Sequence, residues 1–401
     1  MIRSTLLLTF FALMAAATPT AAQFPIKIPK IPKAEKPKPT GTPERSTDKT
    51  EGRTDSPGAG RSQPGHVYPN EQRPSKPAVV LPRVFIKTAS TNSYWKMPNV
   101  SGVTSWLPEI AVNFAFDHSS RIEAIAEYYN PDGSLWFAEK LQAVDGDHGL
   151  LLRSNETWSL MDTKSTNQTG IYSLKVKNKT TGEVMFSGRF RVNKFPASFN
   201  PTREKHKFGY FVDHDWLVPL GIVSLPAEDI TKGINDPMFS VWLKGDVSYE
   251  ELEAELIYNG RSIARRKATS GMSYDERTAE FIVPFAHQHL VKRWTFSFTN
   301  VSYQNGTVHN LDDLADTHWM DRNPGSYTFK VYRKGTQIRE FTFGVGPDGR
   351  LVRPSYSDGL RFPQYGILLA AKMISTTEKW NPNAWNADMF YGNPLPGFTI
   401  Q

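Results

Sequence analysis

The feature that most constrains the fold of this chain is a stretch that occurs twice. Residues 170–192 read GIYSLKVKNKTTGEVMFSGRFRV, and residues 325–345 read GSYTFKVYRKGTQIREFTFGV. In each copy apolar and polar side chains alternate, a turn that contains glycine follows, and a second alternating run returns. Alternation with a period of two is typical of a strand that has one buried face. Each copy therefore predicts a β-hairpin, and the repeat predicts two similar domains that each end with it.

Both copies contain the pattern Gly-x-Tyr-x-Leu/Phe-x-Val, with Tyr172 and Leu174 in the first and Tyr327 and Phe329 in the second. This pattern resembles strand F of immunoglobulin-like β-sandwiches. The resemblance implies that each tyrosine hydroxyl bonds to nearby backbone and that the next apolar position points into the core. Leu174 and Phe329 stand where disulfide-bonded members have a cysteine, and this chain has none. The resemblance covers the hairpin alone and indicates a fold, with another type of β-sandwich as the alternative.

Turn signals predict two further hairpins. Residues 121–141, RIEAIAEYYNPDGSLWFAEKL, contain an Asn-Pro-Asp-Gly turn, and residues 250–268, EELEAELIYNGRSIARRKA, contain the Asn259-Gly260 pair, a strong hairpin signal. These hairpins echo each other at an offset of about 130 residues, whereas the terminal hairpins are about 155 residues apart. The second domain is therefore expected to carry an insertion of about 25 residues within 268–323. Insertions fall in loops, and loops often carry function.

These patterns predict an all-β protein with two tandem immunoglobulin-like β-sandwiches. The first is expected over residues 83–195 and the second over 205–346, followed by a C-terminal extension over 347–401. Within the extension, residues 365–380 (YGILLAAKMISTTEKW) lack an early helix breaker and predict one short helix that ends before Pro382. The extension is expected either to pack on the second domain or to dock a partner.

The first 22 residues have the features of a secretory signal peptide. They contain Arg3, an apolar run from Leu6 to Ala17, and small residues at Thr20 and Ala22. The run is shorter than the roughly 20 residues that a helix needs to span a bilayer, and no later stretch reaches that length. We therefore expect an exported protein with no transmembrane segment in the mature chain. Because a secreted eukaryotic protein of this length without cysteine is unusual, we expect the periplasm or cell surface of a Gram-negative bacterium.

Residues 23–82 contain twelve prolines and few aromatic residues, which predicts a disordered, extended linker. The formal net charge of +7 is concentrated at this end of the chain. Residues 24–82 have eleven Lys or Arg and six Asp or Glu, and Arg3 adds one charge, which leaves +1 for residues 83–401. A nearly neutral globular part argues against a nucleic-acid partner. The cationic linker is either a solvated spacer or a contact for anionic lipid, lipopolysaccharide or cell-wall polymer.

The expected insertion contains the densest group of potential metal ligands. It has His287 and His289 in FAHQHL and a second group in VHNLDDLADTHWM, namely His309, Asp312, Asp313, Asp316 and His318. Zinc is bound by two or three histidines with a carboxylate, and His287 and His289 would share a face of a strand. No HExxH or comparable spacing is present, and polar loops collect such residues without binding metal. A divalent metal such as zinc is therefore an alternative to the expectation that the protein has no cofactor.

Asp213, His214 and Asp215 are consecutive in FVDHDWLVP. A carboxylate beside histidine can orient a general base. On a strand, however, His214 would point away from the side shared by the two aspartates. No Gly-x-Ser-x-Gly motif accompanies the group, and no cysteine is available as a nucleophile. The sequence therefore predicts a polar cluster here and no catalytic residues.

Among the aromatic residues of the extension, which lies outside the predicted sandwich pattern, the best candidates for binding are Trp380, Trp385, Phe390 and Tyr391. Exposed flat aromatic rings can stack on a glycan or a peptide. Buried rings would instead fix the extension to the second domain. These four residues are the candidate binding site, with core packing as the alternative interpretation.

The sequence as a whole indicates an exported, noncatalytic binding or structural module of the bacterial cell envelope. We expect its partner to be an envelope protein or a glycan. The alternative is a metal-dependent hydrolase with its site at His287, His289, His309 and His318. Architecture alone does not fix function, so the arrangement of these residues in space distinguishes the two hypotheses.

Overall fold

The computed structural model describes residues 63–64, 77–90, 105–115, 122–146, 149–196, 208–225, 234–268, 289–304, 307–308, 316–357, 365–375, 378–385 and 397–400. Residues Pro57–Gln401 group into one compact unit. Within it the described residues form mainly β-strands, with one short α-helix and several 3₁₀ turns. The prediction of an all-β protein is confirmed.

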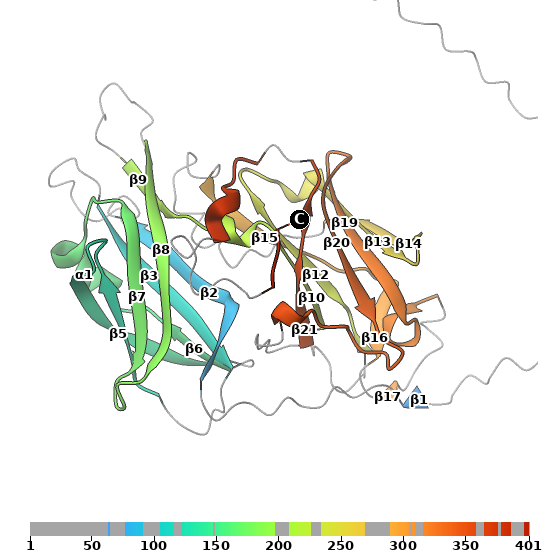
Figure 1. Ribbon diagram of the computed structural model, residues 1–401, viewed down its shortest axis with the longest axis horizontal. Helices are drawn as coiled ribbons and strands as arrows, with labels where there is room; N and C mark the ends of the chain where they lie inside the picture. The colour runs from blue at the N-terminus through green and yellow to red at the C-terminus, as the bar shows by residue number, and fades with distance from the viewer. Residues whose placement is uncertain are drawn as a thin grey trace, which may run out of the picture. The chain divides into compact units, whose positions relative to one another are not determined.

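The first half of the unit is a single antiparallel sheet of eight strands (Figure 1). Thr88 Oγ1 donates a hydrogen bond of 2.6 Å to the carbonyl oxygen of Tyr210, so the two edge strands of this sheet meet. The sheet is therefore a nearly closed barrel, and it differs from the two separate sheets that were expected. In order across the sheet the strands are β2 (Ala78–Ser90), β3 (Trp106–Ala115), β6 (Gly149–Arg153), β5 (Leu135–Gly146), β4 (Ala124–Tyr129), β7 (Gly170–Asn178), β8 (Val184–Pro196) and β9 (Phe208–Val212).

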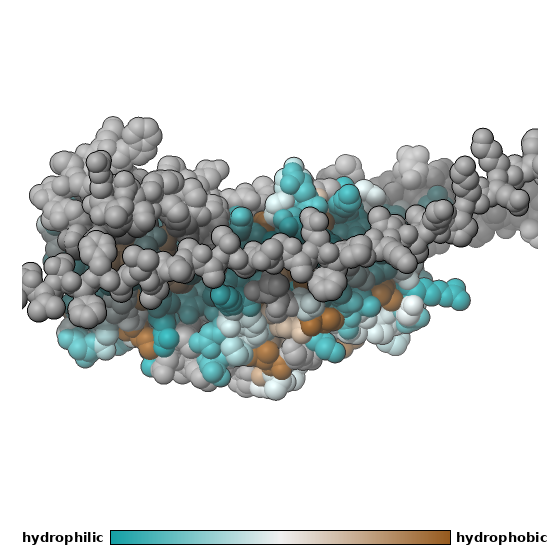
Figure 2. Space-filling view, turned by 90° about the horizontal axis from the view of Figure 1, so that it is seen from above, coloured by the Kyte–Doolittle hydropathy of each residue, from teal (hydrophilic) through white to brown (hydrophobic). Residues whose placement is uncertain are grey.

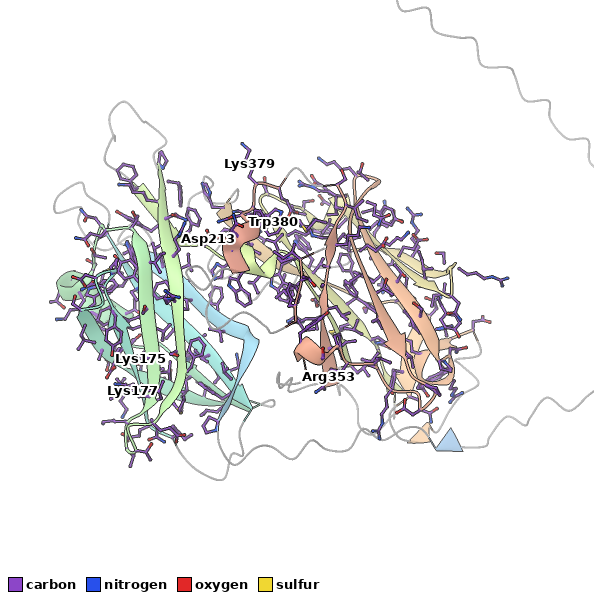
Figure 3. The ribbon with its side chains drawn as sticks, in the orientation of Figure 1. Lys175, Lys177, Asp213, Arg353, Lys379 and Trp380 are labelled. Carbon is purple, nitrogen blue, oxygen red and sulfur yellow. The ribbon has the colours of Figure 1, made fainter. Side chains whose placement is uncertain are left out.

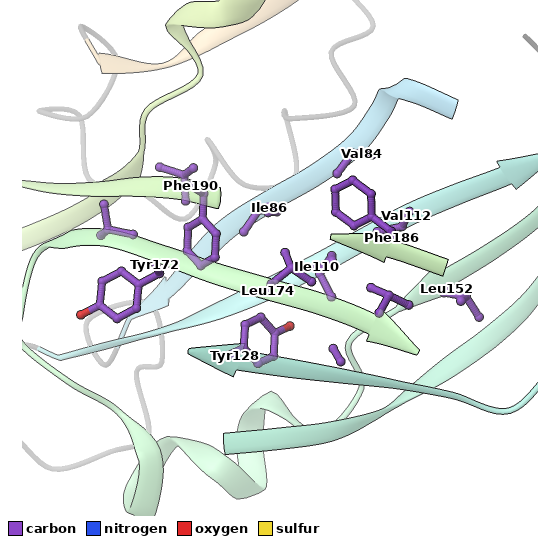
Figure 4. Close-up of a cluster of buried hydrophobic side chains, with 14 of the residues drawn as sticks. Val84, Ile86, Ile110, Val112, Tyr128, Leu152, Tyr172, Leu174, Phe186 and Phe190 are labelled. Carbon is purple, nitrogen blue, oxygen red and sulfur yellow. The ribbon is translucent and has the colours of Figure 1, made fainter. Parts of the chain in front are cut away.

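Alternate residues of these strands fill the barrel. Helix α1 (Thr157–Lys164) follows β6 and contributes Met161 to the same core. Figure 4 shows this cluster, with Tyr128 on β4 beside Leu174 on β7. Each side chain in the cluster is nearly or fully buried because strand alternation sends every second residue inward.

The second half has two antiparallel sheets that share one core. Phe239 on the first sheet stacks on Phe329 of the second, with ring centroids 5.0 Å apart. One sheet has the order β15 (Val291–Phe296), β12 (Met238–Lys244), β10 (Leu220–Leu225) and β21 (Tyr365–Ala370). The other has the order β14 (Arg261–Lys267), β13 (Leu252–Tyr258), β19 (Gly325–Arg333), β20 (Thr336–Val345) and β22 (Lys372–Met373).

Shorter elements complete the described chain. Strands β11 (Ile234–Asn235), β16 (Val301–Gln304) and β18 (His318–Trp319) form a small sheet, and β1 (Gln63–Pro64) pairs with β17 (Thr307–Val308). The 3₁₀ turns are η2 (Asp215–Leu217), η3 (Tyr249–Glu251), η6 (Met320–Arg322), η7 (Ser355–Ser357) and η8 (Pro382–Trp385).

The repeated hairpin is confirmed as β7–β8 and β19–β20. The tyrosine hydroxyls behave as the resemblance implied: Tyr172 donates to the carbonyl oxygen of Gln168 at 3.2 Å, and Tyr327 donates to that of Asn323 at 2.8 Å. Both tyrosines are fully buried, as are the neighbouring core positions Leu174 and Phe329.

The repeat extends beyond the terminal hairpins. Strand β4 pairs with β7 and β13 pairs with β19, so that Tyr128 lies opposite Leu174 just as Leu256 lies opposite Phe329. The register shifts directly after Val176 in one copy and directly after Val331 in the other. A bulge at the same place in both copies bends the strands in the same way. The Asn259-Gly260 hairpin is also confirmed, with positive φ at both residues.

Three boundaries differ from those expected. Strand β2 begins at Ala78, inside the segment 23–82 that was expected to be linker. Of the rest of that segment the structure describes only β1 and Pro77, and residues 1–22 lie outside the described residues. Strand β9 lies beyond the expected end of the first domain but pairs with β8 and completes the first sheet. The region 268–323 holds strands β15, β16, β17 and β18, so the expected insertion is partly sheet.

The helix predicted over residues 365–380 is wrong. Residues Tyr365–Ala370 form β21, whose six residues all pair with β10, and β22 follows as an addition to β20. Ile367 and Leu369 face the second core, while Leu368 belongs to the first. Composition alone does not distinguish a helix from a strand in an apolar run that is buried on both faces. The open edge of β10 selects the strand, because its backbone groups need partners.

Candidate functional site

A buried ion pair lies just after β9. Asp215 begins η2 and is 3% exposed. Lys244 Nζ, at the end of β12, donates to Asp215 Oδ1 at 2.5 Å, and the backbone N–H of Asn381 donates to Asp215 Oδ2 at 2.6 Å. The N–H of Asp215 in turn donates to Asp213 Oδ1 at 3.0 Å. Both carboxylate oxygens of Asp215 are thus engaged by groups distant in the sequence.

Burial shifts the pKa values in this cluster. Desolvation and the neighbouring Asp213 raise the pKa of Asp215, against the opposing effect of Lys244. Desolvation lowers the pKa of His214 to about 4, so its imidazole is neutral near pH 7. The His214 ring stacks on Phe85 with centroids 5.7 Å apart. The cluster is surrounded by core side chains such as Trp216, which is fully buried. Its charges connect η2 with the end of β12 and with the C-terminal extension.

A second buried ion pair fixes the C-terminal extension. Arg339 on β20 is fully buried and its guanidinium donates to Glu378 Oε2. Burial raises the pKa of Glu378, an effect that Arg339 opposes. The next residues reach Asn381, which binds Asp215. The extension is therefore anchored at two points by charge.

Only part of the predicted aromatic site is described. Trp380 lies between the two anchors and is partly buried against the first core, whereas its neighbour Lys379 is exposed (Figure 3). This arrangement favours packing over recognition for Trp380. Trp385 ends η8, and nothing is described of its side chain. Phe390 and Tyr391 lie outside the described residues.

The predicted metal ligands are also only partly described. His289 stacks on Phe211 of β9, with ring centroids 4.5 Å apart. His318 Nε2 lies 2.9 Å from the hydroxyl of Tyr327 on β19. Desolvation lowers the pKa of both histidines. The two thus have separate aromatic neighbours, while His287, His309, Asp312 and Asp313 lie outside the described residues.

Within the described ranges, no three residues among His, Cys, Asp and Glu come close enough together to hold a metal ion. Asp316, the remaining predicted ligand, is exposed.

An open groove of about 360 Å³ lies beside the paired ends of β19 and β20. Its lining is mostly apolar and includes Val352, which is 55% exposed. Phe343 and Leu369 form its floor and belong to the second core. The groove contains no charged side chain: the lining residues are Gly325, Ser326, Thr342, Phe343, Gly344, Val352, Pro354 and Leu369.

The surface visible in Figure 2 is mainly hydrophilic where it is coloured, with separate small hydrophobic patches. The large apolar side chains exposed among the described residues come from different elements: Leu135, Val184, Tyr249, Val352 and Ile374. On β7 the exposed Lys175 and the half-buried Lys177 follow each other (Figure 3).

Sequence reasoning missed the anchors Lys244, Arg339 and Glu378. The sequence contained a signal for Lys244 and Arg339. Lys244 ends the apolar strand MFSVWLK, and Arg339 interrupts the apolar strand TQIREFTFGV. Such residues indicate a buried partner. The partner of Arg339 could not be named, because Glu378 is 39 residues away.

No family model, no curated protein and no solved structure matches this chain. Among the described residues, no helix has the length and apolar character needed to cross a bilayer.

Proposed function

We propose that this protein is an exported, noncatalytic binding or structural module of a bacterial cell envelope, built from two tandem immunoglobulin-like sandwiches. Its partner is an envelope protein or glycan that contacts the outward sheet faces and loops. The expected signal peptide and the cysteine-free sequence support the export and the periplasmic or surface location.

The observation that carries the proposal is the state of the Asp213–Asp215 cluster. It combines two carboxylates, a histidine and a lysine, yet Asp215 is buried and both its oxygens already accept hydrogen bonds. A catalytic acid or base must reach the reacting group within hydrogen-bond distance. These contacts support an internal brace as the role of the Asp213–Asp215 cluster, in agreement with a noncatalytic function.

Strand order supports the immunoglobulin-like assignment. Counted along each copy from β2 and from β10, and without the short strands β11, β16, β17 and β18, the first, second and fifth strands are neighbours in the order β2-β3-β6 and β10-β12-β15. The fourth, third, sixth and seventh are neighbours in the order β5-β4-β7-β8 and β14-β13-β19-β20. Immunoglobulin-like sandwiches likewise have the first, second and fifth strands in one layer and the third, sixth and seventh in the other. The fourth strand joins the first layer in constant-type domains, whereas here it pairs with the third. In the first copy β5 continues from one layer into the other and joins them through β6.

The full chain, immobilised and exposed to a Gram-negative envelope extract, tests the proposal. We expect saturable capture of one protein or one glycan, with no shortening or chemical change of the captured molecule after prolonged incubation. Mass spectrometry of proteins and gel filtration of glycans measure the change. Cleavage or modification of the captured molecule by the purified chain would replace the binding function by an enzymatic one.

A further inference from the structure

The pair of Asp215 and Lys244 is more deeply buried than the other pairs of lysine and carboxylate among the described residues. Lys244 Nζ lies 2.5 Å from Asp215 Oδ1, and the two side chains are 11% and 4% exposed. Lys177 and Glu127 lie at a similar distance, 2.6 Å, but their side chains are 30% and 21% exposed. Water therefore solvates the charges of Lys177 and Glu127, whereas those of Lys244 and Asp215 are shielded from it.

A site without water favours the neutral form of such a pair. Desolvation and the charge of Asp213 raise the pKa of Asp215, whereas a hydrogen bond from Lys177 lowers the pKa of Glu127. Transfer of one proton along the hydrogen bond turns a carboxylate and an ammonium into a carboxylic acid and a free amine. A desolvated lysine amine is a nucleophile. The two groups that an amide bond requires are therefore in contact within the core.

The second oxygen of Asp215 has a backbone donor. The N–H of Asn381 donates to Oδ2 at 2.6 Å. A donor aimed at a carbonyl oxygen stabilises the negative charge that develops there when a nucleophile adds to the carbon. Oδ2 is thus placed to become the oxygen of an amide, and Oδ1, which contacts Lys244 Nζ, is placed to leave.

We propose that Lys244 and Asp215 are joined by an amide bond between Nζ and Cγ. Nζ adds to Cγ, and the bond between Cγ and Oδ1 breaks. Two of the three protons of the lysine ammonium leave with Oδ1 as one water molecule, so atoms and charges balance without an oxidant, a reductant or a cofactor. The folded core accelerates the reaction because it holds the amine against the carboxyl group.

The other buried ion pair of the described chain is a useful comparison. Arg339 and Glu378 are also in contact and buried. A guanidinium stays protonated and is held in place by its planar hydrogen bonds, so it does not attack a carboxyl group. The anchor at Glu378 therefore remains an ion pair, and the covalent bond forms at Asp215 alone.

The bond would stabilise a chain that can form no disulfide bond, since it has no cysteine. Residues 215 and 244 are 29 positions apart, and the closed loop contains β10 and β12. The bond fixes η2, whose Trp216 lies in the first core, to the end of β12 in the four-stranded sheet. A closed loop also restricts the unfolded chain. This role does not depend on which partner the protein binds.

Mass spectrometry of a tryptic digest of the full chain tests the proposal. Trypsin does not cut after a lysine whose amine is acylated, so the peptide that contains Lys244 should extend over 233–261. We expect this peptide to be linked to 208–232, which contains Asp215, in one species about 18 Da lighter than the sum of the two. The missing mass is that of one water molecule.

Lys244→Arg keeps a positive charge beside Asp215 but removes the amine. We expect this variant to yield 208–232 and 233–244 as separate peptides with the masses of their sequences. Lys177→Arg changes the more exposed pair with Glu127 in the same way and is the matched control, which should retain the linked species. Circular dichroism shows whether each variant is folded.

Separate peptides from the folded original chain would overturn the proposal and leave an ion pair at this position. A linked species in Lys244→Arg would also overturn it, because another residue would then form the bond. The original chain decides the question by itself if Lys244→Arg does not fold.

Discussion

At the scale of single residues, the glycine that opens each repeated hairpin is held in a conformation that other residues rarely adopt. Gly170 and Gly325 both have φ of 150°. A Cβ on Gly325 would lie 2.9 Å from Asn259 Oδ1, and one on Gly170 would lie 3.1 Å from Pro131 Cγ. Both positions therefore combine backbone strain with crowding, which explains why the repeat begins with glycine in both copies.

We expect Gly325→Ala to lower the free energy of unfolding by about 2–4 kcal/mol, because strain and the clash with Asn259 add. Gly182→Ala is the matched control. Its φ is +73° but its Cβ would have nothing within 4 Å, so strain alone should cost about 1 kcal/mol. Urea unfolding measures both. An equal loss in the two variants would show that the contact with Asn259 contributes nothing.

His214 makes the stability depend on pH. Its pKa is about 4 in the folded state and about 6.5 when unfolded, so between these values the unfolded chain binds the additional proton. Stability from this residue is therefore complete above pH 6.5 and falls as the pH drops toward 4. The raised pKa values of Asp215 and Glu378 act in the opposite direction, since those carboxyls favour folding when protonated.

Comparison with His214→Gln isolates the histidine. Between pH 7 and pH 4.5 we expect the original chain to lose about 2–3 kcal/mol more stability than the variant. Chemical unfolding at the two pH values gives both differences. Parallel loss in the two proteins would mean that His214 is protonated in the folded state.

At the scale of elements, the sequence correctly predicted the hairpins, whose formation depends on residues that are close together in the chain. The hairpins at Asn259-Gly260 and Gly170–Val192 follow from alternation and turn residues, and the tyrosine bonds follow from one short motif. Strand β21 and the closure of the first sheet did not follow. Both depend on which open edge an apolar segment meets in space, and the sequence of that segment does not contain this information.

The buried pair that anchors the extension can be tested by a double-mutant cycle. Glu378→Leu leaves the fully buried Arg339 without its carboxylate, so we expect a loss of about 3–5 kcal/mol. Arg339→Leu should be similarly costly alone, whereas the double variant should recover much of the loss, since two apolar side chains pack without a buried charge. Thermal unfolding in the same buffer supplies the four values. Additive losses would contradict a direct pair.

At the scale of the whole molecule, the first core does not end with the first sheet. It also contains Trp216 and Leu217 after β9, together with Trp242, Val291 and Leu368 from the four-stranded sheet of the second half. The ion pair of Asp215 with Lys244 joins the same segments. Apolar contacts and a desolvated charge thus connect the eight-stranded sheet to the two sheets of the second half, which is more than a flexible linker would provide.

This connection predicts one cooperative unfolding transition for the described part of the chain. Trp216→Ala removes a fully buried ring at the connection, so we expect a loss of about 3–5 kcal/mol and a separation into two transitions. Phe329→Leu, within the second core, is the control: it should lower stability without splitting the transition. Differential scanning calorimetry resolves the transitions. Two separate transitions in the unmodified protein would show that the shared core does not couple the two halves, and that each half folds independently of the other.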